Sequence, residues 1–155
     1  MIEVGKSPPA FTLKDQDGKS VRLRALAGQW VVLYFYPRDD TPGCTIEACD
    51  FSAGVRQFRK LDALILGCSA DDAASHTRFI RKHKLRVTLL CDPNHGVMAK
   101  YGAYGEKTLY GKKTVGVIRS TVLIGPDGKV AHHWKRARAK GHAGQVRQRL
   151  EELRG

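Results

Sequence analysis

One stretch constrains the fold of this chain more than any other. An apolar run from Val31 to Tyr36 is followed at once by a turn and two cysteines. The run is too short, and too rich in β-branched and aromatic residues, for a helix, so it predicts a buried strand of a parallel sheet. Pro37 ends this strand because proline cannot donate to a β-ladder. The residues from Asp39 to Gly43 are turn formers.

Beyond this turn the apolar residues follow the period of a helix. Those on one helical face are Phe51, Val55, Phe58 and Leu61. We therefore expect Cys44 in the first turn of a helix, directly after a strand-to-helix loop. A helix N-terminus presents unpaired N–H groups and the positive end of the macrodipole, which stabilise an anion such as a thiolate. The thiolate is the nucleophilic form of cysteine, so this position favours a reactive Cys44 over a merely packed one.

The rest of the chain alternates strands and helices. The Asp17-Gly18 pair predicts a hairpin turn near the N-terminus. Further strands are expected at 63–68, 87–90, 120–124 and 129–134, and further helices at 73–83, at 95–101 and around 146–153, with a loop of weak β character at 105–116. The order β-α-β-α-β followed by β-β-α predicts an α/β fold with a central mixed sheet and helices on both faces.

Length and hydropathy set the broad class. The 155 residues, 42% of them hydrophobic, are expected to form one folded domain over 1–155. No apolar stretch approaches about 18 residues, so we expect neither a membrane span nor a membrane partner. The first residues lack a charged-then-apolar signal sequence, and we expect a cytoplasmic protein.

The net charge of +12, from 27 basic and 15 acidic residues, invites a nucleic-acid hypothesis. The basic residues are spread along the chain, however, with denser groups at 78–86 and 135–140, and no nucleic-acid motif accompanies them. A solvated basic surface that steers an acidic protein partner is the favoured interpretation, and no specific nucleic acid is expected.

Pro37, Thr41 and Cys44 form the pattern Pro-x-x-x-Thr-x-x-Cys, which resembles the signature of the peroxiredoxins. The fuller Thr-Pro-Gly-Cys-Thr-x-Glu-Ala-Cys of residues 41–49 is similar to the Q-type, or bacterioferritin-comigratory, group. The Gly-Val-Ile-Arg-Ser-Thr segment of residues 116–121 resembles the segment in which that family carries its catalytic arginine. The resemblance implies a thioredoxin-like fold with an N-terminal β-hairpin.

The resemblance also implies an activity: a thiol-dependent peroxidase that reduces hydrogen peroxide and organic hydroperoxides. Cys44 would be the peroxidatic nucleophile, oxidised to a sulfenic acid. Arg119 would hold the anions, because arginine stays charged and offers several fixed donors. Thr41 would contact the peroxide, Pro37 would shape the pocket, and Glu47 would orient the arginine. An acidic residue at position 47 also fits the first turns of a helix for electrostatic reasons alone.

Cys49 lies five residues after Cys44, the spacing of the resolving cysteine in many Q-type proteins. Within an intact helix, Cα atoms five residues apart are separated by about 8–9 Å, whereas a disulfide needs about 7 Å or less. We therefore expect the first helical turns to unwind after Cys44 is oxidised, giving a Cys44–Cys49 disulfide that thioredoxin or a similar dithiol reduces. The alternative is that Cys49 only fills the core.

The other candidate ligands and thiols receive no catalytic role. Cys68 and Cys91 end strands expected to be neighbours, so a further disulfide is conceivable, but buried packing is favoured. The adjacent His132 and His133 would face opposite sides of a strand, and no histidine has a recognisable metal-ligand spacing. We expect no metal and no cofactor, and the resemblance suggests a monomer.

The main alternative is a disulfide-exchange protein or thiol chaperone of thioredoxin type. It is weaker because the chain has no Cys-x-x-Cys pair and no proline between Pro93 and Pro126 to stand beside the site. The second alternative is a basic nucleic-acid binder.

Overall fold

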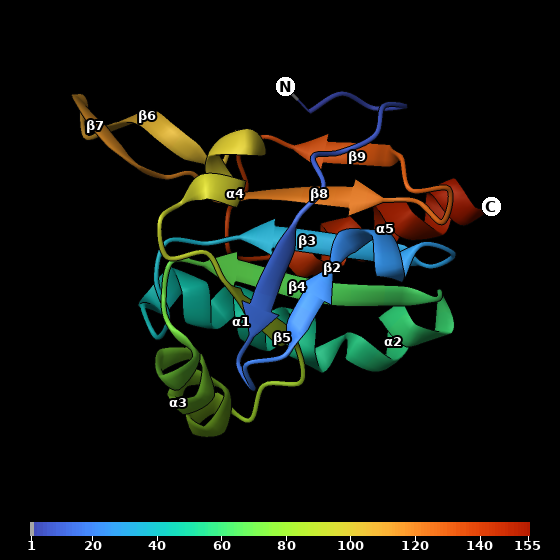
Figure 1. Cartoon of the computed structure of the whole chain (residues 1–155), viewed down its shortest axis with the longest axis horizontal. Coiled ribbons are helices and arrows are strands. Elements are labelled where there is room, and N and C mark those ends of the chain that lie inside the picture. Colours follow the sequence, from blue (N-terminus) through green and yellow to red (C-terminus); the bar gives the residue numbers. More distant parts are fainter. Residues whose placement is uncertain (1) are drawn as a thin grey trace.

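The structure of the protein is a computed structural model, which describes residues 2–155. A seven-stranded mixed sheet forms its centre (Figure 1), in the order β2-β1-β5-β4-β3-β8-β9. These strands are β1 (Thr12–Asp15), β2 (Ser20–Arg22), β3 (Trp30–Phe35), β4 (Ala63–Ser69), β5 (Thr88–Cys91), β8 (Ser120–Ile124) and β9 (Val130–Trp134). The helices are α1 (Pro42–Ala53), α2 (Val55–Lys60), α3 (Ala73–His83), α4 (Gly96–Lys100) and α5 (His142–Arg154), with a 3-10 turn at Leu23–Leu26.

Strand direction confirms the predicted mixed sheet. β3, β4 and β5 are parallel, whereas β8 is antiparallel to β3 and β1 is antiparallel to β5. β3 lies inside the sheet, between β4 and β8, and its residues from Val31 to Phe35 are all buried. This burial on both faces explains why the strand reads as a continuous apolar run.

Each face of the sheet carries its own core. On one face α1, α2, α3 and α5 contribute Phe51, Phe58, Phe79 and Val146, respectively. On the other face the 3-10 turn and α4 contribute Leu23 and Met98. The expectation of helices on both faces is therefore confirmed.

The helix predicted after the Cys44 turn is divided into two helices in the structure. The apolar period of residues 51–61 is continuous, but the chain bends at Gly54, which ends α1 and precedes α2. Gly54 still lets Phe51 and Phe58 pack against each other, with ring centroids 6.0 Å apart. Because both halves bury the same face, the hydrophobic pattern alone does not reveal the break.

The segment expected to be a loop of weak β character is a regular hairpin. β6 (Tyr104–Leu109) and β7 (Lys112–Val117) pair antiparallel as a separate two-stranded sheet. Tyr110 and Gly111 between them both have positive φ, 52° and 79°, as a tight two-residue turn requires. Figure 1 shows this hairpin projecting from the body of the molecule.

Within residues 2–155, none of the helices has both the length and the apolar character needed to span a bilayer.

Candidate active site

Cys44 lies where the sequence predicts it, in the first turn of the helix that follows β3. Thr41 is the N-cap of α1, and Pro42 occupies the first helical turn, where its missing N–H costs no hydrogen bond. The Cys44 side chain is only 1% exposed. The thiol is therefore nearly buried and lies in the helical turn whose N–H groups have no partner within the helix.

Sheet pairing brings Arg119 to this thiol from a distant part of the sequence. Ser120 at the start of β8 pairs with Phe35 at the end of β3, so Arg119 lies beside the loop that leads into α1. Its Nη2 donates to Cys44 Sγ at 3.3 Å. Its Nη1 donates to Glu47 Oε1 at 2.5 Å. One guanidinium thus bridges the thiol and a carboxyl group one turn further along α1.

Burial and charge have opposite effects on this pair. Burial alone lowers the pKa of Arg119, but the charges of Glu47 and Cys44 outweigh it and raise that pKa. Burial raises the pKa of Glu47 to about 7, although Arg119 opposes the rise. The second carboxyl oxygen of Glu47 has no hydrogen-bond partner in the described part of the chain, and the whole residue is 0% exposed.

Small residues around Arg119 leave space for its guanidinium and bind its backbone. A Cβ atom on Gly43 would stand 3.1 Å from Nη2 of Arg119 and 3.7 Å from Cβ of Ala139. The Ala137 N–H donates to the Arg119 carbonyl at 2.8 Å. The segment after β9 therefore packs over the arginine, and only glycine at position 43 leaves the guanidinium its full space.

Thr41 and Pro37 border the site without a recorded bond to the thiol. The Thr41 hydroxyl donates to the Arg38 carbonyl at 2.9 Å and stabilises the turn. Pro37 is exposed just after the end of β3. The contact of Thr41 with peroxide and the shaping of the pocket by Pro37 stay predictions.

Cys49 faces away from Cys44. Both thiols are free, and α1 runs unbroken through both of them. Five helical residues turn by about 500°, so the two side chains point about 140° apart. Cys49 is half-buried at the edge of a hollow of about 240 Å³, lined also by Ser52, Ala53, His83, Lys84 and Arg86. Burial and the neighbouring Asp50 raise the pKa of the Cys49 thiol.

The two remaining cysteines point to opposite faces of the sheet, and so do the two adjacent histidines of β9. Cys68 pairs with Leu90, so Cys91, one residue further along β5, points to the other face. This geometry disfavours the conceivable Cys68–Cys91 disulfide. His132 and His133 pair with Leu123 and Val122 and alternate in the same way.

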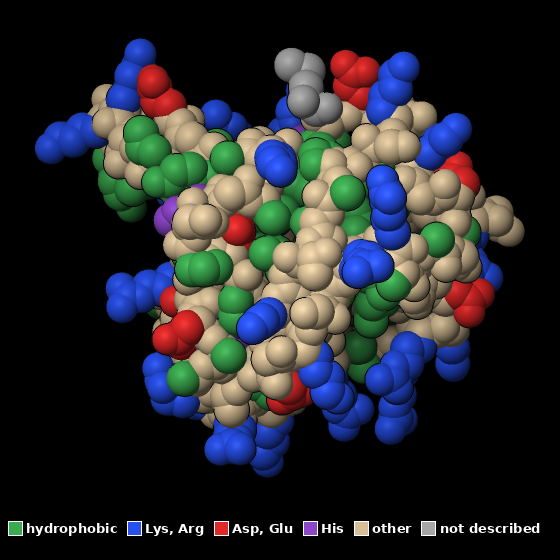
Figure 2. Space-filling view, viewed as in Figure 1, with side chains coloured by type: hydrophobic (Ala, Val, Ile, Leu, Met, Phe, Trp, Pro, Cys, Tyr) green, Lys and Arg blue, Asp and Glu red, His purple; other side chains and the backbone are tan. Residues whose placement is uncertain are grey.

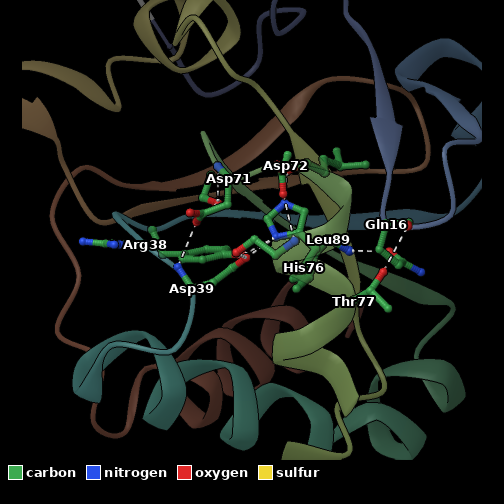
Figure 3. A network of polar contacts seen from close by, with 12 residues as sticks. Gln16, Arg38, Asp39, Asp71, Asp72, His76, Thr77 and Leu89 are labelled. Carbon is green, nitrogen blue, oxygen red and sulfur yellow. Dashed lines mark hydrogen bonds and ion pairs between the residues drawn. The ribbon is translucent and has the colours of Figure 1, made fainter. Parts of the chain in front are cut away.

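Sequence reasoning missed a buried polar network beside the site. Figure 3 shows the His76 ring of α3 directed at Asp39, in the loop between β3 and α1. His76 Nδ1 lies 2.7 Å from Asp39 Oδ2. The hydroxyls of Tyr36 and Ser75 also donate to this carboxylate, at 2.6 and 2.8 Å. The only signal in the sequence was a histidine on the apolar face of the predicted helix at 73–83.

Both ring nitrogens of His76 face acceptors. Nε2 lies 2.9 Å from the Leu90 carbonyl, and Nδ1 faces the Asp39 carboxylate. Burial lowers the pKa of His76, but the Asp39 hydrogen bond and charge outweigh it and raise that pKa. When His76 is protonated, it therefore donates to both acceptors and forms a buried ion pair with Asp39. Asp71 adds a potential metal ligand within 4.8 Å of both, yet its Oδ2 already accepts from the Asp39 N–H and the Ser69 hydroxyl.

Comparison with known proteins places this geometry in a family. Residues 4–133 match the AhpC/TSA family. The chain is 47% identical to the putative peroxiredoxin bcp of Helicobacter pylori over 152 residues, which cover 98% of each chain. It is 39% identical to the peroxiredoxin Bcp of Bacillus subtilis, over 98% of this chain and 97% of the relative.

Solved structures of similar proteins agree with this family assignment. The bacterioferritin comigratory protein of Xanthomonas campestris, studied for its alkyl peroxide reduction activity, superposes with a TM-score of 0.91 at 36% identity, over 99% of this chain and 100% of that one. Xanthomonas campestris peroxiredoxin Q gives a TM-score of 0.89 at 38% identity, over 96% and 97%. The predicted thioredoxin-like fold and peroxidase class are thus confirmed, and the chain belongs to the AhpC/TSA family, as an oxidoreductase of the peroxiredoxin Bcp type.

Proposed function

We propose that Cys44 is the peroxidatic nucleophile of a thiol peroxidase acting on hydrogen peroxide and organic hydroperoxides. Its thiolate attacks one peroxide oxygen, forming an S–O bond as the O–O bond breaks. The departing oxygen leaves as water or an alcohol once it has taken a proton, and Cys44 becomes a sulfenic acid. The observation that carries this proposal is the bridge from Arg119 to Cys44 Sγ and Glu47.

The surrounding residues have electrostatic and steric roles in this proposal. Arg119 stabilises the thiolate and the negative charge that develops on the departing oxygen. Glu47 positions the guanidinium. The Thr41 hydroxyl donates to or accepts from the peroxide, and Pro37 limits the access of water to Cys44. We propose that the enzyme is a monomer and place it in the cytoplasm, where thiols stay reduced.

Cys49 then resolves the sulfenic acid. Its thiolate attacks Cys44 Sγ, an S–S bond forms, and hydroxide leaves and is protonated to water. The first turns of α1 must unwind for this step, because the two side chains diverge in the intact helix. A thioredoxin-type dithiol then reduces the disulfide by exchange, becoming oxidised itself.

Intact-mass spectrometry with thiol alkylation tests the cycle after one equivalent of hydrogen peroxide. In the wild type we expect the loss of two hydrogens, mapped to Cys44 and Cys49. In Cys49→Ser we expect a sulfenic acid at Cys44, which a dimedone-type probe traps. A disulfide to Cys68 or Cys91 would leave the peroxidase and replace the resolving thiol, whereas an unreactive Cys44 would refute the proposal.

A further inference from the structure

The β6–β7 hairpin, residues 104–117, carries apolar side chains that nothing in the described part of this chain covers. Leu109 is 54% exposed, Tyr110 96% and Val115 64%. They are three of the six large hydrophobic residues that are exposed within residues 2–155. A two-stranded hairpin has little stability of its own, and solvent-exposed apolar groups on such an element often mark an interaction site.

The hairpin is also cationic. Lys107, Lys112 and Lys113 lie on its strands, against a single acidic residue, Glu106, which stands 3.6 Å from Lys113. Figure 2 shows apolar side chains grouped on this projection with basic side chains around them. Such a surface fits a partner that has an apolar patch bordered by carboxylates.

The base of the hairpin is attached to the active-site end of the sheet. The Ile118 N–H donates to the Ala103 carbonyl at 2.7 Å and closes the base, and His95 stacks on Tyr104 at 4.1 Å. Arg119, which directly follows Ile118 in the chain, binds Cys44 Sγ. A six-residue strand spans about 20 Å, so the hairpin extends roughly that far from the backbone of the catalytic arginine.

We propose that the β6–β7 hairpin is a docking arm for the dithiol protein that reduces the Cys44–Cys49 disulfide. A reductant must bring its thiol to this end of the sheet, and a partner of about 100 residues has a radius of gyration of about 13 Å, enough to contact site and arm together. This geometry favours a protein over a membrane as the occupant. The inference rests on the proposed peroxidase cycle and adds the surface that recognises the reductant.

The test separates the two half-reactions by stopped-flow fluorescence. Leu109→Ser with Tyr110→Asn removes the apolar tip while keeping the turn, because asparagine tolerates the left-handed conformation of position 110. We expect reduction by thioredoxin to slow at least tenfold. Truncating an interface tyrosine can cost about 1.4 kcal/mol or more, which corresponds to a factor of ten or more. Oxidation by hydrogen peroxide and reduction by dithiothreitol should change less than about twofold, because neither reagent needs a docking surface.

Two valines give a matched control. Val115 on the arm is 64% exposed, and Val4 elsewhere is 63% exposed. Val115→Ser should slow reduction by thioredoxin about threefold, which is less than the tip variant, because a rim contact matters less than a central one. Val4→Ser should leave the rate unchanged, because Val4 lies outside the arm.

Each other outcome has a distinct meaning. Unchanged thioredoxin kinetics in the tip variant would overturn the arm and leave the peroxidase cycle standing. Reduction of the wild type by dithiothreitol but not by thioredoxin would overturn the choice of partner. A tip variant that loses only its sedimentation with phosphatidylglycerol vesicles would make the arm a membrane contact, and failure of Cys44 to oxidise would instead refute the cycle itself.

Discussion

Gly43 shows how one missing side chain fixes the geometry of the active site. A Cβ atom at this position would lie 3.1 Å from Arg119 Nη2, the atom that binds Cys44. We predict that Gly43→Ala displaces the guanidinium and slows oxidation of Cys44 by roughly tenfold or more, because electrostatic stabilisation depends on preorganised donors.

Stopped-flow oxidation under hydrogen peroxide measures this effect. Gly144→Ala is the matched control, since Gly144 also lies in a helix but a Cβ atom there would have no described neighbour within 4 Å. Equal rates for the two variants would contradict the packing argument.

Glu47 gives a pH dependence of known sign. Its folded-state pKa of about 7 exceeds its ordinary value of 4.5, so between these values the folded state binds more protons than the unfolded state. Stability must therefore fall as pH rises from 4.5 to 7, by an amount of about 3 kcal/mol at most. In Glu47→Gln this part of the fall should disappear.

Urea denaturation at several pH values from 4.5 to 7.5 tests this sign. Glu3→Gln, at an exposed position, should keep the wild-type slope. A Glu47→Gln variant with the wild-type slope would mean that another group takes up the protons.

At the scale of elements, the His76–Asp39 pair joins α3 to the loop that precedes α1. Its histidine has a raised pKa, so the stability it contributes is complete below the ordinary value of 6.5 and is lost as pH rises through the folded-state pKa. We predict that His76→Asn costs about 3 kcal/mol at pH 6, the typical effect of breaking a buried pair.

The cost should become smaller above neutral pH, and this pH profile distinguishes the ion pair from simple loss of packing. His95→Asn is a suitable control because His95 is partly exposed and has the left-handed backbone, with φ of 60°, that asparagine accepts. A penalty that stays constant from pH 6 to pH 9 would argue for packing alone.

In the proposed cycle, the α1 helix must be stable enough to position Cys44 and weak enough to unwind for Cys49. Ile46 lies between the two thiols and is 45% exposed, so substitutions there alter helix propensity with little loss of packing. Glycine and alanine differ by about 1 kcal/mol in a helix. If unwinding precedes the disulfide, Ile46→Gly should form it up to about fivefold faster than Ile46→Ala.

Gln148, exposed in the middle of α5, provides the control pair. Gln148→Gly and Gln148→Ala should form the disulfide at equal rates. Quenched alkylation with mass spectrometry measures the rates of all four variants. Equal rates for the two Ile46 variants would place the slow step elsewhere.

The elements that the sequence predicts are those with a strong period or a buried run, such as β3 and α3. The hairpin at 104–117 escaped prediction because it is solvated on both faces and so lacks a regular apolar alternation. The Gly54 break escaped because both halves bury one face. Among site residues, Cys44, Arg119 and Glu47 follow from motifs, whereas His76 acts through a contact with Asp39, 37 positions away, that only the fold creates.

At the scale of the whole molecule, the net charge of +12 is large for 155 residues. Lys84 and Arg86 line the hollow beside Cys49, and three lysines follow the β6–β7 arm. Like charges distributed in this way raise the encounter rate with an acidic partner and leave that with neutral hydrogen peroxide unaffected. The two half-reactions should therefore respond differently to ionic strength.

We predict that the second-order rate of reduction by an acidic thioredoxin falls about tenfold between low salt and roughly 0.5 M salt, where the Debye length is only a few ångströms. Oxidation by hydrogen peroxide should change by less than about twofold over the same range, because the peroxide has no net charge. Lys84→Glu with Arg86→Glu should reduce the salt dependence of the first reaction and leave the second as it was. If both half-reactions respond equally to salt, the ions act on the enzyme itself, and the basic surface has no part in selecting the partner.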